Sequence, residues 1–183
     1  MTNYNTLTHN LKRGILKFSE EISKNLSRPK FKFVSQMVYG LLNGQNVHLS
    51  SIARALDEKT TLKKTIDRLS RNLQEFENSE VLFENYIKSV KQQIKDNSIL
   101  IIDGSDITKP CSRKMECLCR VRDGSTGEYG NGYHTLGVTA LTPEKKMPIP
   151  VYTKIYSSEE KGFISEDREV FFQRYRLWYG LKK

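Results

Sequence analysis

The stretch "ILIIDGSDITKP", residues 99–110, decides how the rest of the sequence is interpreted. Its four successive aliphatic residues predict a strand that is too apolar to be half-exposed and therefore lies inside its sheet. We expect this strand to end at Asp103, so that the buried neighbours fix the carboxylate, and Gly104 to let a phosphate or metal come close to the backbone. Asp106 is placed in the turn that follows. The same letters also suit plain turn chemistry, in which an Asp hydrogen-bonds its own backbone.

Length and charge narrow the class of protein. The chain has 183 residues, 37% of them hydrophobic, which is enough for one domain or two small ones with a folded core. Its formal net charge of +9 favours partners that carry phosphate groups or an anionic surface. No apolar run reaches the length of a signal peptide or a membrane span, so we expect a cytoplasmic protein without a membrane partner.

The hydrophobic pattern changes near residue 98 and predicts two domains, 1–97 and 98–183. In the first, apolar residues recur every three or four positions, as in amphipathic helices. In the second, short apolar and β-rich runs separated by glycines and prolines predict three strands, followed by a helix with Ser165 as its N-cap. The fold class expected from this order is α+β. The predicted strands contain 99–102, 133–142 and 146–158.

Residues 50–73 predict a helix, a short turn and a second helix, the layout in which a second helix enters the major groove of DNA. The expected N-caps are Ser50 or Ser51 for the first helix and Thr60 or Thr61 for the second.

The second of these helices carries cations on the side opposite its apolar stripe. Arg can pair bidentately with guanine, and Lys can neutralise phosphate. We therefore predict a DNA-binding surface on this helix. The alternative is the ordinary solvated face of a helix in a basic protein. The predicted surface consists of Lys63, Lys64, Arg68 and Arg71.

Asp103 and Asp106 are the candidate metal ligands. Enzymes of phosphoryl transfer hold Mg²⁺ through a few carboxylates and otherwise through water and substrate phosphates. A strand that ends in Asp is a rigid way to present one such carboxylate. The turn interpretation given above stays open for both residues.

Three segments of the second half together resemble a known family. They are "ILIIDGSDITKP", "KMECLCRVRDGSTGEYGNGYHTLGVTAL" and "KKMPIPVYTKIYSSEEKGFISEDREV". In this order they resemble the opening of the catalytic domain of bacterial insertion-sequence DDE transposases, in the "insertion sequence four" group. The resemblance covers roughly residues 30–180, and 99–167 is its specific part. It implies a helical DNA-binding domain followed by the first part of an RNase H-like core, namely three antiparallel strands and a helix.

The resemblance also implies a chemistry. Such transposases cut and rejoin transposon-end DNA by two-metal phosphoryl transfer, with an Asp on the first strand, a second Asp after the fourth strand and a Glu on a late helix. Asp103 matches the first acid, so it is the expected catalytic residue and ligand of Mg²⁺ or Mn²⁺. The other two acids have no matching positions, because the sequence ends at Lys183. We therefore expect a catalytically incomplete site.

Three interpretations of function stay open. The first is the N-terminal portion of a transposase that binds double-stranded transposon ends. The second is a stand-alone DNA-binding protein, or an inhibitor of a full-length transposase, without catalysis. The third is a small nuclease built on Asp103, Asp106 and Glu116.

The expected first strand also bears on assembly. In an RNase H-like sheet this strand has a neighbour on each side, and here the fourth strand is missing, so one apolar edge is expected to be bare. The hypothesis that follows is that the isolated chain is poorly stable unless it forms a homodimer or pairs with the missing half.

Overall fold

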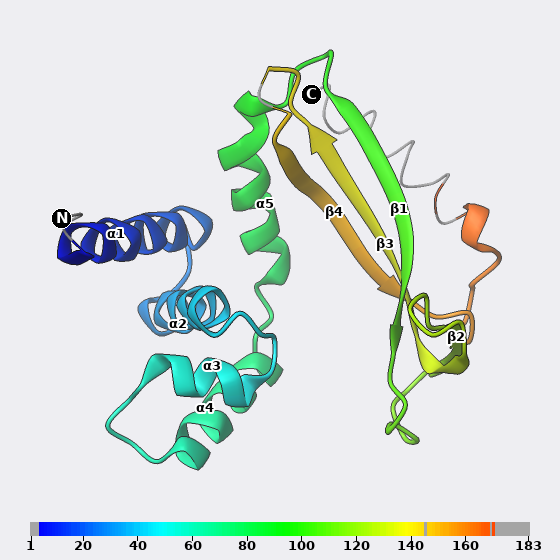
Figure 1. Cartoon of the computed structure of the whole chain (residues 1–183), viewed down its shortest axis with the longest axis horizontal. Helices are drawn as coiled ribbons and strands as arrows, with labels where there is room; N and C mark the ends of the chain where they lie inside the picture. The colour runs from blue at the N-terminus through cyan, green and yellow to red at the C-terminus, as the bar shows by residue number, and fades with distance from the viewer. Residues whose placement is uncertain (1–3, 145, 169, 171–183) are drawn as a thin grey trace. The chain divides into compact units, whose positions relative to one another are not determined.

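The computed structural model describes residues 4–144, 146–168 and 170. Within these residues, five α-helices are followed by a four-stranded antiparallel sheet (Figure 1). The predicted α+β class is therefore confirmed. None of the helices in this described part combines the length and the apolar character that a bilayer crossing requires.

The chain divides into two compact units, Met1–Ser89 and Val90–Lys183. The division lies shortly before residue 98, where the hydrophobic pattern changes.

The helices begin close to where the sequence places them, with two differences at their ends. The N-cap of the third helix is His48 in extended conformation, so the predicted caps Ser50 and Ser51 are wrong. The apolar spacing of residues 79–95 predicts one helix, but the structure ends that helix at Val90 and continues with a short 3-10 helix, Lys91–Gln93. The five helices are α1 (Tyr4–Ile22), α2 (Arg28–Gly44), α3 (Leu49–Leu56), α4 (Leu62–Gln74) and α5 (Ser79–Val90).

An apolar core joins α2, α3 and α4. Its buried members are Phe33 of α2, Ile52 and Ala53 of α3 and Leu69 of α4. The Phe33 ring also meets the ring of Phe76, with 5.6 Å between the centroids. Because each of the three helices contributes to this cluster, α4 is packed against a scaffold made by the two helices before it.

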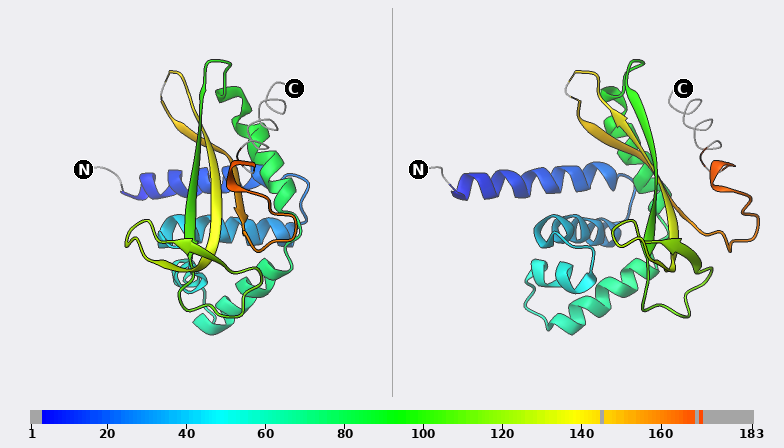
Figure 2. Two further views of the ribbon diagram at one scale, coloured as in Figure 1. Left: turned by 90° about the vertical axis from the view of Figure 1, so that its right-hand side faces the viewer. Right: turned by 45° about the vertical axis from the view of Figure 1, so that its right-hand side comes forward.

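α2 and α3 approach one another closely at Gly40. A Cβ atom added at this position would lie 2.4 Å from Cγ2 of Ile52. Carbon atoms do not approach so closely, so a side chain here would force the two helices apart. Figure 2 shows α2 lying between α1 and α3.

β3 is the central strand of the sheet in the second unit. It pairs antiparallel with each of the other strands, and the three long strands follow the predicted antiparallel order. The short β2 was not predicted. The strands are β1 (Ile99–Thr108), β2 (Cys119–Arg122), β3 (Tyr129–Leu141) and β4 (Pro148–Tyr156).

β1 is longer than the sequence suggested. It pairs with β3 without interruption, from Ile99 opposite Leu141 to Thr108 opposite Gly132. The predicted end of the strand at Asp103 is therefore wrong, and so is the turn at Asp106. The Gly-Ser-Asp sequence favours a turn only locally, whereas each of its residues pairs with one in β3, and this ladder prevails over the local preference.

β1 lies at an edge of the sheet, since among the described strands it pairs only with β3. Its residues Ile99 and Ile101 are 62% and 48% exposed. The interior position predicted from the apolar run is thus not found in the described part of the sheet. The edge of β1 that faces away from β3 has no partner strand among the described residues.

The predicted helix after β4 lies mostly outside the described residues. Its first turn is described, with residues 166–168 helical. The backbone N–H of Arg168 donates a hydrogen bond to Oγ of Ser165 at 3.2 Å. Ser165 therefore caps this turn, as predicted.

We predict that Gly40→Ala lowers the free energy of unfolding by about 1–3 kcal/mol, because the added methyl group overpacks the contact with Ile52. Urea unfolding followed by circular dichroism measures the change. Gly14→Ala is the matched control, since nothing lies within 4 Å of a Cβ atom at that helical position. The control should be neutral or stabilise α1 by up to about 1 kcal/mol. Equal stability of the Gly40→Ala variant and the wild type would contradict the close approach of α2 and α3.

Candidate nucleic-acid interface and the Asp103 groove

α3 and α4 form the helix-turn-helix that the sequence predicted. The turn begins at Asp57, whose backbone is left-handed at φ 44° and ψ 50°, and whose N–H bonds the carbonyl of Arg54. Asp tolerates this conformation better than most residues, which explains how the turn forms without the usual glycine. Thr61, in extended conformation, is the N-cap residue of α4, one of the two predicted positions, although its side chain makes no capping hydrogen bond.

Three of the four predicted DNA-binding cations lie on the exposed side of α4. Lys63, Lys64 and Arg71 are all exposed. Within the described part of the chain, none of their side chains forms a hydrogen bond or an ion pair. These three side chains are therefore available to an anionic partner.

The side chain of Arg68, by contrast, is partly buried and hydrogen-bonded. Its Nη2 donates to both carboxylate oxygens of Glu58, at 2.8 Å each, and its Nη1 donates to Oε1 of Gln36 at 2.8 Å. The Gln36 amide in turn donates to Glu58 at 2.9 Å. We call these three side chains the Arg68 clamp. The clamp connects α2, the turn and α4, so the guanidinium group serves to hold α4 in place.

The buried hydroxyl group of Thr65 supports the clamp. Oγ1 of Thr65, a residue that is 2% exposed, donates to Oε2 of Glu58 at 3.1 Å and lies 2.9 Å from Oγ1 of Thr60. Thr65 therefore faces inward and cannot reach a base edge.

The clamp favours the ionised form of Glu58. Burial by itself would raise the pKa of this carboxyl group. Hydrogen bonds from Arg68 and Thr65 outweigh burial, and the charges of Arg68 and Lys32 act in the same direction. The pKa of Glu58 therefore lies below its ordinary value.

Sequence reasoning found Arg68 but missed its partners. Gln36 lies on a different helix, and Glu58 lies in the turn, where no helical periodicity relates it to Arg68. Charge alone did not single out Glu58, because the helix-turn-helix contains two further acidic residues, Asp57 and Asp67.

Asp103 lies in the middle of β1 and is exposed. Gly137 is opposite it on β3, so no side chain faces it directly. The carboxylate borders a hollow of about 390 Å³ on one face of the sheet. Apart from Ile101, the other residues lining this hollow are small or carry hydroxyl groups: Ser105, Thr135, Gly137, Thr139 and Thr153.

Asp106 lies on the opposite face of β1, because it is an odd number of residues from Asp103 on the same strand. Its Oδ1 lies 2.7 Å from Nδ1 of His134, and its Oδ2 accepts the backbone N–H of Arg122 at 3.1 Å. Glu166 is a second, more distant carboxylate, 3.5 Å from the same His134 nitrogen. The structure therefore does not bring Asp103 and Asp106 together as two ligands of one ion.

The fit of a divalent ion to these residues is limited. Among residues 4–144, 146–168 and 170, no three His, Cys, Asp or Glu residues gather as metal ligands. Asp103 offers one carboxylate, beside hydroxyl groups. Mg²⁺ commonly binds one or two carboxylates and keeps several waters or substrate phosphates, so Asp103 remains a predicted ligand that requires further acids or substrate.

No family model, curated protein or solved structure matches this chain. The relationship to insertion-sequence transposases therefore rests on the sequence segments themselves and stays a prediction.

We predict that Glu58→Gln destabilises the folded chain by about 1–2 kcal/mol near neutral pH, because one charge-assisted partner of Arg68 is lost from a half-exposed clamp. A folded-state pKa below the unfolded one gives stability that is present above the unfolded pKa and lost as the pH falls through the folded value. The difference between wild type and variant should therefore shrink as the solution becomes acidic. Urea unfolding at several pH values measures it.

The control for this experiment is Arg71→Ala, which removes an exposed cation from the same helix and should leave stability nearly unchanged. A Glu58→Gln difference that stays constant into acid would show that the carboxylate charge does not hold α4.

Proposed function

We propose that the chain binds double-stranded DNA through α4 and is related to the bacterial insertion-sequence DDE transposases. One observation carries the DNA-binding part. The Arg68 clamp fixes α4 on the scaffold of α2 and α3, while Lys63, Lys64 and Arg71 face solvent without an ion pair among the described residues.

The dimensions and the charge of α4 support this proposal. The helix has 13 residues, so it is about 20 Å long, and the B-DNA major groove of about 12 Å width admits an α-helix. Lys63 and Lys64 lie in its first turn, from which recognition helices reach base edges.

The second unit supplies Asp103 in this proposal. The carboxylate would be one ligand of Mg²⁺ or Mn²⁺ in a two-metal site for phosphoryl transfer, which needs further acids beside it. In such a site Asp103 would supply an oxygen ligand, held in place by the pairing of β1 with β3. The partner that we propose is duplex DNA, specifically transposon ends. We also propose that the chain is located in the cytoplasm. A homodimer formed through the bare edge of β1 is the second proposed partner.

A stand-alone DNA-binding protein, or an inhibitor of a full-length transposase, is the second candidate. The placement of Asp103 and Asp106 on opposite faces of β1 favours it over a complete nuclease. A nuclease built on these two acids and Glu116 would need them to converge on one phosphate.

We predict that the double variant Lys63→Ala/Lys64→Ala binds a duplex DNA about tenfold or more weakly than the wild type. The fall of log affinity with log salt should also become less steep, by roughly 2 in the slope, because two phosphate contacts are lost. Fluorescence anisotropy at several salt concentrations measures both quantities. Lys88→Ala, on α5, is the control and should change neither. An unchanged affinity and slope in the double variant would refute DNA binding by α4.

A second prediction concerns catalysis. With Mg²⁺ or Mn²⁺, we expect the chain alone to leave supercoiled plasmid DNA intact, because a single acid does not hold the two ions of the reaction. Gel electrophoresis of plasmid nicking measures this. Nicking that is lost in Asp103→Ala and kept in Asp106→Ala would instead establish a complete nuclease with Asp103 in its active site.

A further inference from the structure

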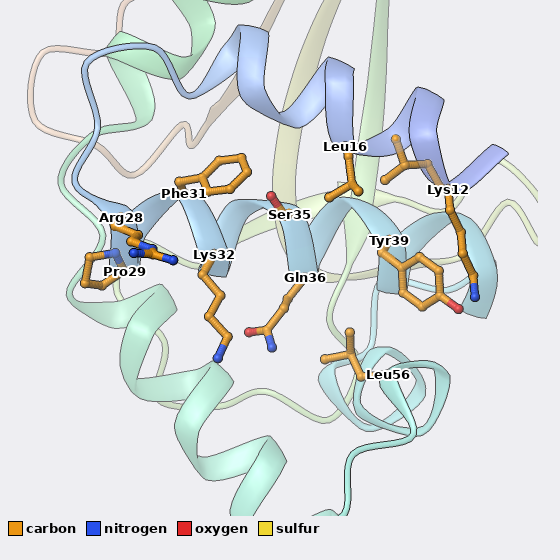
Figure 3. Close-up of a pocket in the computed structure, with 11 residues that line it drawn as sticks. Lys12, Leu16, Arg28, Pro29, Phe31, Lys32, Ser35, Gln36, Tyr39 and Leu56 are labelled. Carbon is orange, nitrogen blue, oxygen red and sulfur yellow. The ribbon is translucent and has the colours of Figure 1, made fainter. Parts of the chain in front are cut away.

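A groove of about 790 Å³ lies along one side of α2 in the first unit. α1 borders it on one side, and the end of α3 borders it on the other (Figure 3). In this view Leu16 extends from α1 toward α2, and Leu56 extends toward α2 from α3. Together with Ile15 and Phe31, these side chains give the groove an apolar lining.

Three cations surround this apolar lining: Lys12, Arg28 and Lys32. All three are exposed, and none forms an ion pair with another described residue. In Figure 3, Arg28 lies at one end of the groove and Lys12 lies beside Tyr39 at the other. The groove therefore has a mainly apolar lining with a cation at each end, and Lys32 and Gln36 lie between the two ends.

The length of the groove fits a helical segment. Along α2 it extends from Arg28 to Tyr39, which is about 16 Å, or roughly three helical turns. An amphipathic helix binds such a groove with apolar side chains at intervals of three and four residues. The cations at the two ends of the groove favour a partner helix that has carboxylates near each of its own ends, next to its apolar face.

We propose that this groove binds an acidic amphipathic helix of a partner protein. DNA is a poorer occupant, because its backbone presents phosphates and sugars, which bind charged and polar groups. These groups would make no favourable contact with the apolar side chains of the groove. This inference goes beyond the proposed DNA binding and does not depend on it.

The groove adjoins the Arg68 clamp. Gln36 lines the groove, and its side chain is bonded to both Arg68 and Glu58. A helix in the groove would therefore contact a residue that holds α4. This contact gives the partner a physical route by which to stiffen α4.

The test uses the full chain and a fluorescent synthetic peptide about four helical turns long, with leucines on one face and glutamates flanking them at both ends. We expect saturable binding by fluorescence anisotropy. Lys12→Glu/Arg28→Glu should weaken it about tenfold or more, because two opposite charges become like charges. Leu16→Ala should also weaken it, and this exposed leucine can be shortened at little cost to folding.

Matched controls separate the groove from general charge effects. Lys17→Glu changes an exposed cation of α1 that does not line the groove, and it should leave binding unchanged. A peptide with lysines in place of glutamates should not bind. Circular dichroism melts of each variant establish that it is folded.

Three results would each overturn the proposal: no binding of the acidic peptide, equal binding of the lysine peptide, or equal loss in Lys17→Glu and Lys12→Glu/Arg28→Glu. If duplex DNA displaces the peptide, and the double variant loses DNA affinity as strongly as peptide affinity, the groove is a nucleic-acid surface and the proposal also fails. A failure of α4 to bind DNA would leave these outcomes unaffected, so the two proposals are tested separately.

Discussion

The guanidinium group of Arg68 sets the orientation of the helix on which the proposed DNA surface depends. It joins Gln36 of α2 to Glu58 in the turn before α4, with three hydrogen bonds of 2.8 Å. Apolar packing is not directional, so burial of Leu69 alone would hold α4 against the core without fixing its rotation. The planar guanidinium group donates hydrogen bonds in only a few directions. The clamp therefore adds a directional constraint to the apolar stripe of α4, of which Ile66 and Leu69 pack at the core, although its contribution to stability is modest.

The clamp can form only because the helices beneath it are close together. Gly40 lets α2 approach α3 until Ile52 occupies the space of a missing side chain. This approach places Gln36, one helical turn before Gly40, on the same side of α2 and within reach of Glu58 and Arg68. Gly40 thus sets the distance between α2 and α3. The Arg68 clamp, which this distance allows to form, then constrains the rotation of α4.

The sequence predicted what depends on local pattern and missed what depends on distant partners. Helix positions followed from apolar spacing, and Ser165 was recognised as a cap because a cap acts within one turn. The extent of β1 was missed, because its Gly-Ser-Asp segment favours a turn locally and becomes a strand only by pairing with β3, about thirty residues later. Arg68 was grouped with Lys63 and Lys64 because charge and helical position do not reveal which cation has a carboxylate partner across a turn.

The two aspartates of β1 show how secondary structure changes the meaning of a spacing. In a helix, residues three positions apart lie on one face and can share an ion. In a strand they lie on opposite faces, so Asp103 and Asp106 act separately. Asp106 bonds His134 and the Arg122 amide, which ties β1 to β3 and β2 and gives this carboxylate a structural role. Asp103 has no such partner among the described residues, and it borders the hydroxyl-lined hollow on the other face of the sheet.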